Sequence, residues 1–334
     1  MPNSRYPTVY DVARHASVSI ATVSRVLNAP ERVRENTRTR VMQAIDELGF
    51  VPKADATARA RKAVGRIGVL TPFFTFPSFV QRMRGVAAAL ADTPFELAIY
   101  PVDSLDRLDG YLSMLPVTRR LDGLIVMALP LNEAAASRLL ANKLETILIE
   151  SQHPDFSSVQ IDDYNGGVLA ATYLLGKGHC RCAFLGPGEL PAYSLHPEDR
   201  RLAGFRDTLN GHGIPLPDEY IRYPALSHPD VHQEIQRWVA LPEPPTAVFA
   251  ASDDLAIRLL RAAREQGIRV PEDLAIIGFD DIDMAEQIGL TTINQSLDES
   301  GRMAAEMVLA RLGDPDRPVQ IVQLSLQVVE RETA

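Results

Sequence analysis

The sequence of 334 residues is poor in cysteine and has a single tryptophan. Its two thiols, Cys180 and Cys182, lie beside one histidine and do not complete a structural zinc site, so we interpret them as packing residues. No apolar run approaches the length of a membrane span, and the basic N-terminus lacks the apolar stretch of a secretory signal. These absences favour a cytoplasmic, multidomain protein with no membrane contact and no cofactor.

Charge is distributed unevenly along the chain. Residues 1–62 carry eleven Lys or Arg and six acidic residues, a net charge of +5, whereas the rest carries −14, because the whole chain has −9. A basic front on an acidic body suits a protein that touches DNA with one part and avoids it with the other.

The basic front contains the pattern of two short helices joined by a tight turn. Thr8 precedes Asp11 by three residues, which resembles a capping box, so the first helix is predicted to start at Thr8. Ser19 can cap a second helix, whose buried side would carry Val23, Val26 and Leu27. The pattern predicts a helix-turn-helix, with an ordinary helical hairpin as the alternative.

The second helix of a helix-turn-helix enters the major groove of DNA, where its first residues meet base edges. Arg25 suits a bidentate contact with guanine. We expect bases to be read by Ile20, Ala21 and Arg25, and phosphates to be held by Thr8, Ser19, Thr22 and Ser24.

A third helix is predicted over residues 37–48, ending at Gly49, a natural left-handed cap. The segment after it, residues 53–61, is rich in helix formers but too short to be stable alone. We expect this segment to fold only with help from DNA or from a second copy of the chain.

From residue 65 onward, strand and helix patterns alternate, which is typical of parallel sheets with ligands at the carboxyl ends of the strands. The length suffices for two α/β lobes with a small-molecule cleft between them. Buried strands are predicted at 66–71, 95–100, 123–127, 146–150, 158–161, 182–186, 247–250 and 274–279, and helices at 79–90, 134–141, 166–176, 201–212, 255–267 and 298–312.

Motifs along almost the whole chain resemble those of transcription regulators of the lac repressor (LacI/GalR) family. None is decisive alone, but their order and spacing are specific. They include Val-Ser-x-x-Thr-Val-Ser-Arg-Val-Leu-Asn at 18–28, Leu-Gly-Phe-x-Pro at 48–52, Ile-Gly-Val at 67–69, Asp-Gly-Leu-Ile at 122–125, Arg-Leu-x-Gly-Phe at 201–205, Pro-Glu-Asp at 271–273 and Gly-Phe-Asp-Asp at 278–281.

The resemblance implies an all-α headpiece at 1–50, a hinge helix at 51–64 and a core at 65–334 that is similar to periplasmic binding proteins. By that analogy the first lobe takes about 65–163 and 295–322, and the second takes about 164–293 and 323–334. The expected assembly is a homodimer on a pseudo-palindromic operator, most simply a repressor under allosteric control.

The resemblance also implies effector-binding residues. Arg201 and Asp280 match family positions that bind ligand hydroxyls or carboxylates, while Ser252 and Glu150 stand where Asn and Asp are usual. Asp253 follows Ser252, and the aromatic residues Phe76 and Phe79 could stack on a ligand at the mouth of the cleft.

Carboxylates and arginine with flanking aromatics favour a sugar as effector, with a purine or nucleoside as the alternative. A two-lobed α/β enzyme is a further alternative, since acidic pairs such as Asp280 and Asp281 could hold a metal. The sequence has no phosphate-binding loop of the Walker type and no Gly-x-Ser-x-Gly elbow, so we expect no catalytic residues.

The hinge departs from the family pattern. Arg59 occupies the place of the usual minor-groove leucine, Lys53 replaces the usual Asn, and Ala56 lies between them on the expected minor-groove face. Leucine wedges kink DNA, whereas arginine favours a narrow, electronegative groove. The hypothesis is weaker kinking or a preference for A·T pairs at the operator centre, unless Asp55 holds Arg59 against its own helix.

Overall fold

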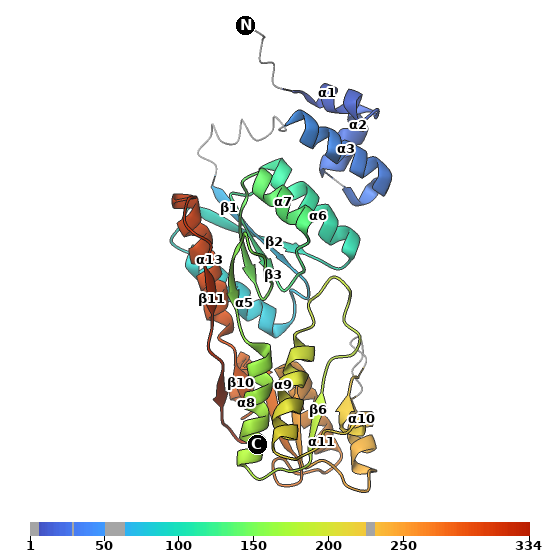
Figure 1. Cartoon of the computed structure of the whole chain (residues 1–334), viewed down its shortest axis with the longest axis vertical. Helices are drawn as coiled ribbons and strands as arrows, with labels where there is room; N and C mark the ends of the chain where they lie inside the picture. Colours follow the sequence, from blue (N-terminus) through green and yellow to red (C-terminus); the bar gives the residue numbers. More distant parts are fainter. Residues whose placement is uncertain (1–6, 29, 51–63, 225–230) are drawn as a thin grey trace. The chain divides into compact units, whose positions relative to one another are not determined.

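The computed structural model describes residues 7–28, 30–50, 64–224 and 231–334 (Figure 1). The predicted hinge residues Lys53, Ala56 and Arg59 lie outside the described residues, so their roles stay predictions. Within the described ranges no helix is long and apolar enough to cross a membrane.

The headpiece consists of short helices packed around a small apolar core. α1 (Val9–His15), α2 (Ile20–Asn28), the 3-10 turn η1 (Pro30–Arg32) and α3 (Glu35–Leu48) follow one another, which confirms the predicted helix-turn-helix and third helix. Gly49 ends α3 in the left-handed conformation with φ 60°, as predicted. The buried residues that hold these helices together are Val12, Ala13, Ala16, Val23, Val26, Val41, Met42, Ala44, Ile45 and Phe50.

The rest of the chain forms two six-stranded sheets with the same strand order. The first sheet has the order β11-β5-β4-β3-β1-β2 and the second β12-β10-β9-β8-β6-β7. Each strand of the second sheet therefore has a counterpart in the first. The first sheet contains β1 (Gly65–Thr71), β2 (Phe95–Pro101), β3 (Gly123–Met127), β4 (Glu145–Ile149), β5 (Ser157–Gln160) and β11 (Ile321–Gln323).

The strands of the second sheet are short, and those in its interior are buried, whereas the edge strands β7 and β12 are partly exposed. They are β6 (Cys182–Leu185), β7 (Ile221–Arg222), β8 (Ala247–Ala250), β9 (Ala275–Asp280), β10 (Thr291–Asn294) and β12 (Gln327–Val329). β9 and β10 are parallel, with Asn294 opposite Asp280, while β12 adds an antiparallel edge. Cys182 is fully buried in β6, where burial raises the pKa of its thiol to about 12, in keeping with a packing role.

Helices follow the strands and flank both sheets. They are α5 (Pro77–Leu90), α6 (Leu105–Thr118), α7 (Glu133–Ala141), α8 (Asp163–Gly176), α9 (Pro197–Gly211), η2 (Asp218–Tyr220), α10 (Val231–Val239), α11 (Asp253–Glu265), α12 (Asp283–Gln287) and α13 (Leu297–Gly313). The six predicted core helices are confirmed, but each begins one to four residues earlier than expected. In α8, α9 and α11 the cause is a mainly polar first turn, which shows no apolar periodicity.

The contacts divide the chain into two compact units. The first comprises Met1–Phe73, Ala89–Ser158 and Ala304–Gln320, and the second comprises Phe74–Ala88, Val159–Met303 and Ile321–Ala334. The core of the second unit includes aromatic rings in contact: Phe184 and Phe249 are edge-to-face with ring centroids 5.5 Å apart, and Phe205 and Phe249 are tilted with centroids 5.2 Å apart. Such ring pairs strengthen apolar burial.

Two pairs of helices cross at glycines. α8 lies against α9, where a Cβ at Gly167 would meet the carbonyl oxygen of Arg201 at 1.9 Å (Figure 1). α5 lies against α13 in the same way, because a Cβ at Gly301 would meet the carbonyl oxygen of Arg82 at 1.9 Å. Only glycine permits backbones to approach so closely.

Replacing Gly167 with alanine should lower the free energy of unfolding by about 1–3 kcal/mol, because the added methyl forces the two helices apart. Urea denaturation followed by circular dichroism measures the change. Gly176→Ala, at the end of the same helix, is the matched control, since its Cβ would meet no atom within 4 Å. That control should be neutral or slightly stabilising, and equal loss in both variants would contradict the crossing argument.

Candidate functional site

The exposed face of α2 carries the predicted base-reading residues. Ile20 is 41% exposed although it is apolar, and Ala21 and Arg25 are exposed beside it. Ser19 caps the helix by accepting a hydrogen bond of 3.1 Å from the amide of Thr22, and the hydroxyls of these two residues are 2.8 Å apart. Ser24 is also exposed. The N-terminal end of α2 is therefore free to meet a large polyanion.

The turn that orients α2 is fixed by specific contacts. Ser17 adopts a left-handed φ of 53° between the helices. Arg40 of α3 donates to the carbonyl oxygens of Ala16 and Ser17, the latter at 3.2 Å. Thr8 donates its amide and hydroxyl to the Asp11 carboxylate at 2.8 and 2.6 Å, so the predicted capping box is confirmed.

A cluster of polar side chains lies at the carboxyl ends of strands in the second unit. Asp280 ends β9, Gln295 follows β10, and Ser252 with Asp253 follows β8. Arg201 joins them from α9. The carboxyl ends of neighbouring parallel strands are where α/β folds bind ligands. We give the name polar cluster to Asp280, Gln295, Arg201 and Arg82, an arginine of α5 that donates to Gln295.

Arg201 is held in one orientation by three contacts. Its Nε donates to Asp163 Oδ1 at 2.8 Å, and its Nη1 donates to the carbonyl oxygen of Ala251 at 2.6 Å. The guanidinium carbon lies 3.6 Å from the ring centroid of Phe279. Since the side chain is only 6% exposed, the guanidinium plane is set before any ligand arrives.

Asp280 is a buried carboxylate on a strained backbone. Its φ of 133° is one that side chains with a Cβ rarely adopt, and such strain concentrates at binding sites. Gln295 donates its amide to Asp280 Oδ1. Burial and then the charge of Asp253 raise the pKa of Asp280, whereas Arg201, Arg82 and the bond from Gln295 oppose that rise.

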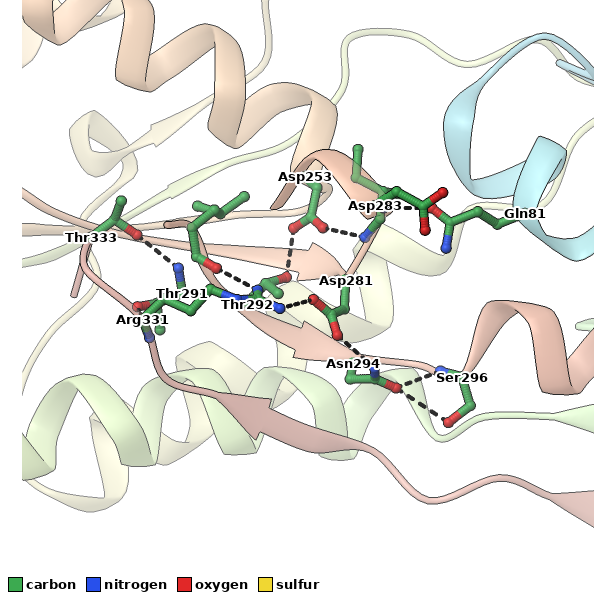
Figure 2. A network of polar contacts seen from close by, with 12 residues as sticks. Gln81, Asp253, Asp281, Asp283, Thr291, Thr292, Asn294, Ser296, Arg331 and Thr333 are labelled. Atoms are coloured by element: carbon green, nitrogen blue, oxygen red, sulfur yellow. Dashed lines mark hydrogen bonds and ion pairs between the residues drawn. The ribbon is translucent and has the colours of Figure 1, made fainter. Parts of the chain in front are cut away.

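Asp253 lies behind this cluster, with no exposed surface. Its carboxylate accepts from the hydroxyl of Thr292 (Figure 2), at a distance of 2.5 Å. It also accepts from the amide of Ile282 at 2.9 Å. Burial raises its pKa as well. Ser252 caps α11 by accepting from the amide of Leu255 at 3.4 Å. Asp253 therefore supports the turn after β9, and its role in effector binding stays a prediction.

The neighbouring Asp281 has both carboxylate oxygens engaged. Asn294 donates to one oxygen at 2.6 Å, and Arg331 forms an ion pair with the other at 2.7 Å (Figure 2). Its φ is 59°, so the turn contains two consecutive residues with positive φ. The two adjacent aspartates therefore have different partners. Asp281 is held by Asn294 and Arg331, whereas Asp280 belongs to the polar cluster.

The sequence analysis missed two members of the polar cluster. Gln295 is 2% exposed and Arg82 3% exposed, and Arg82 Nη2 donates to Gln295 Oε1 at 2.7 Å. Gln295 directly follows a strand, so its position at a strand end was a usable signal. Arg82 lies in the largely polar stretch Gln81-Arg82-Met83-Arg84 of α5, and no local pattern shows that it pairs across 213 residues of sequence.

The remaining predicted effector residues are more dispersed. Phe79 is half-buried on α5, 5.8 Å from the guanidinium carbon of Arg82, while Phe76 precedes α5 and is 40% exposed. Glu150 belongs to the first unit, where it follows β4 with a φ of 65°. Since β4 is the counterpart of β9 in strand order, Glu150 and the turn after β9 occupy equivalent positions.

Three potential metal ligands come together once in the described part of the chain. His196, Glu198 and Asp199 lie at the start of α9, and Glu198 is 7% exposed. His196 Nδ1 is 3.2 Å from Glu198 Oε1, so these groups already contact each other. Exposed acidic groups of this kind are common without an ion.

Comparison with protein families gives two matches. The model described as "Bacterial regulatory proteins, lacI family" matches residues 8–53, and the "Periplasmic binding protein-like domain" matches residues 171–334. The HTH-type transcriptional repressor CytR of Escherichia coli K12 is 32% identical over 310 residues, which cover 91% of this chain and 89% of that protein. PurR of Vibrio atlanticus, another HTH-type transcriptional repressor, is 31% identical and covers 98% of both chains.

Solved structures of the same architecture are also similar. A LacI family transcriptional regulator from Enterococcus faecium with bound ribose has a TM-score of 0.69 at 31% identity, covering 80% of this chain and 98% of that one. The lac repressor dimer bound to operator and the anti-inducer ONPF has a TM-score of 0.68 at 26% identity, covering 98% and 99%. The expected resemblance is confirmed: the chain belongs to the lacI family of bacterial regulatory proteins, as a DNA-binding transcription regulator with a helix-turn-helix headpiece and an α/β core like that of periplasmic binding proteins.

Proposed function

We propose that this regulator is controlled by a sugar that binds the polar cluster. The observation that carries the proposal is the fixed pair of Arg201 and Asp280, a guanidinium clamped by Asp163 and a carboxylate that already accepts from Gln295. A carboxylate beside a planar set of N–H donors matches the paired hydroxyls of a sugar, which both donate and accept. Because both groups are positioned in advance, little ordering is needed on binding.

Among sugars, a pentose is the first candidate, because the LacI family regulator from Enterococcus faecium, which is 31% identical to this chain, has ribose bound. The aromatic side chains of Phe76 and Phe79 suit the C–H face of a sugar ring. They also suit a nucleobase, so a ribonucleoside is the second candidate. Ser252 would contribute from the end of β8, while Asp253 would act by holding the turn after β9. Glu150, which follows β4 in the first unit, stays a predicted effector residue.

On the DNA side, we propose that α2 reads one half of a pseudo-palindromic operator, with one chain of a homodimer on each half. Ile20, Ala21 and Arg25 would contact bases, and Thr8, Ser19, Thr22 and Ser24 would contact phosphates. The exposure of five of these residues at the start of α2 and along it supports the assignment: Ser19, Ile20, Ala21, Ser24 and Arg25. Thr22 is half-buried on α2, and the half-buried Thr8 caps α1. The lac repressor dimer on its operator provides the precedent for the assembly.

We further propose that the chain catalyses no reaction and acts in the cytoplasm, where its operator would be. The relatives are transcriptional repressors. The acidic side chains that suggested an enzyme have structural partners, since the carboxylates of Asp253 and Asp281 are both engaged by the chain itself.

Arg25→Ala should weaken operator binding by about 1–3 kcal/mol and relax the base preference at one position of each half-site. Selection from a random DNA library with the wild-type protein provides the operator, and fluorescence anisotropy measures the affinities. Arg14→Ala removes an equally exposed arginine from α1 and is the control. If both variants lose affinity equally, with no change in base preference, Arg25 holds phosphate instead.

Asp280→Asn should weaken sugar binding by about tenfold or more, because a hydrogen bond to a charged group contributes about 1.5–3 kcal/mol. Titration calorimetry with D-ribose, other pentoses, adenosine and cytidine measures this and separates the two effector classes. Asp254→Asn is the control, since Asp254 is paired with Arg258 on the exposed side of α11. Binding of free nucleobases in preference to every sugar would overturn the proposal.

A further inference from the structure

Arg82 occupies a place in α5 that corresponds to the place of Arg201 in α9. Both arginines precede by three residues a glycine at a helix crossing, Gly85 in α5 and Gly204 in α9. The carbonyl oxygen of each arginine is the nearest atom that an added Cβ would meet on the partner helix's glycine, Gly301 for Arg82 and Gly167 for Arg201. α5 follows β1 as α9 follows β6, and these strands are counterparts in the two sheets.

The two buried arginines converge on one carboxylate by different routes. Arg201 approaches Asp280 from α9 and lowers its pKa through its charge. Arg82 also lowers that pKa, and it donates to Gln295, which in turn donates to Asp280. A chain of hydrogen bonds thus runs from α5 through the residue after β10 to the end of β9.

The orientation of the Gln295 amide follows from the chemistry of arginine. A guanidinium has only donors, so the group that faces Arg82 must be the amide oxygen. The amide nitrogen then points to Asp280 Oδ1 as a donor. Without Arg82, the amide could rotate and present its oxygen to Asp280, which would favour the protonated carboxylic acid.

Asp280 needs this support because its other surroundings oppose ionisation. Burial and the carboxylate of Asp253, at the start of α11, disfavour the charged form. Arg201 favours it, but its charge is shared with Asp163 of α8. A protonated Asp280 would be a donor at one oxygen and a weaker partner for sugar hydroxyls.

We infer that Arg82 is a positioning residue of the effector site, which fixes the Gln295 amide and thereby keeps Asp280 an acceptor for the hydroxyls of the effector. The inference rests on the proposed sugar site and adds a residue that need not touch the sugar. Arg82 would then also set the pH below which effector affinity is lost.

The test is the pH profile of D-ribose affinity for the full chain with Arg82→Met. An opposite charge near a carboxylate lowers its pKa by about one to three units, so the variant should lose affinity at a pH at least about one unit higher than the wild type. Below that midpoint it should bind about tenfold more weakly, and the difference should close at higher pH. A constant loss at every pH would overturn the inference, because it would show a merely structural role.

Two further variants sharpen the test. Arg82→Lys keeps a cation with donors only and should restore most of the wild-type profile. Arg302→Met removes an arginine that pairs with Glu299 on α13, and it should leave the profile unchanged. If Arg82→Met does not fold, Gln295→Leu is the substitute variant. It removes the hydrogen bond from Gln295 to Asp280 and should likewise raise the pH at which sugar affinity is lost.

A measurement without sugar separates this inference from the proposed function. Because the pKa of Asp280 is raised in the folded protein, there is a pH range in which Asp280 is protonated when folded and ionised when unfolded. Within that range the free energy of unfolding falls as the pH rises, and the fall stops once Asp280 ionises in the folded protein. In Arg82→Met that fall should extend to higher pH in thermal unfolding, and adding Asp280→Asn should abolish the difference. If the wild type binds no sugar but this shift appears, the control of Asp280 by Arg82 through Gln295 is supported and the effector assignment fails. If the shift is absent, the control of Asp280 by Arg82 is refuted.

Discussion

The buried carboxylate of Asp253 is the constraint on which the effector site depends. It joins three elements, because it starts α11, accepts from Thr292 in β10 and accepts from the amide of Ile282 in the turn after β9. That turn contains Asp280 and Asp281 with positive φ, a conformation that costs free energy and persists only when neighbouring contacts impose it. Asp281 adds a second anchor through Arg331 and Asn294. The backbone of the turn that carries Asp280 is therefore held by hydrogen bonds and an ion pair of other side chains.

A second feature is the repetition of one arrangement in both halves of the core. The sheets share a strand order, and in each half the helix after the first strand crosses another helix at paired glycines. Each crossing brings the carbonyl of a buried arginine against the backbone of the partner helix. Arg82 and Arg201 occupy matching places in this repetition, although their local sequences differ. The repetition also gives Glu150 a position equivalent to the turn after β9.

The sequence predicted the elements best where the signals were local. The capping box at Thr8, the cap at Ser19 and the glycine after Leu48 were each confirmed, because side-chain capping depends on residues only a few positions apart. Most interior strands of the two sheets were found from their apolar runs. The interior strand β10 was missed, because its sequence Thr-Thr-Ile-Asn contains one apolar residue. β7, β11 and β12 were missed as well, because strands of two or three residues at sheet edges are too short to show a pattern.

The amino-acid sequence by itself determined that this chain has a basic helix-turn-helix headpiece, an alternating α/β core and a lacI family order of motifs. It also placed Arg201 and Asp280 among the candidates for the effector site. Only the tertiary structure decided that Asp253 supports the site from behind, that Ser252 caps α11, and that Arg82 and Gln295 join Asp280. The physical reason is distance along the chain. Capping and periodicity act over a few residues, whereas these hydrogen bonds join residues that come together only when strands and helices pack.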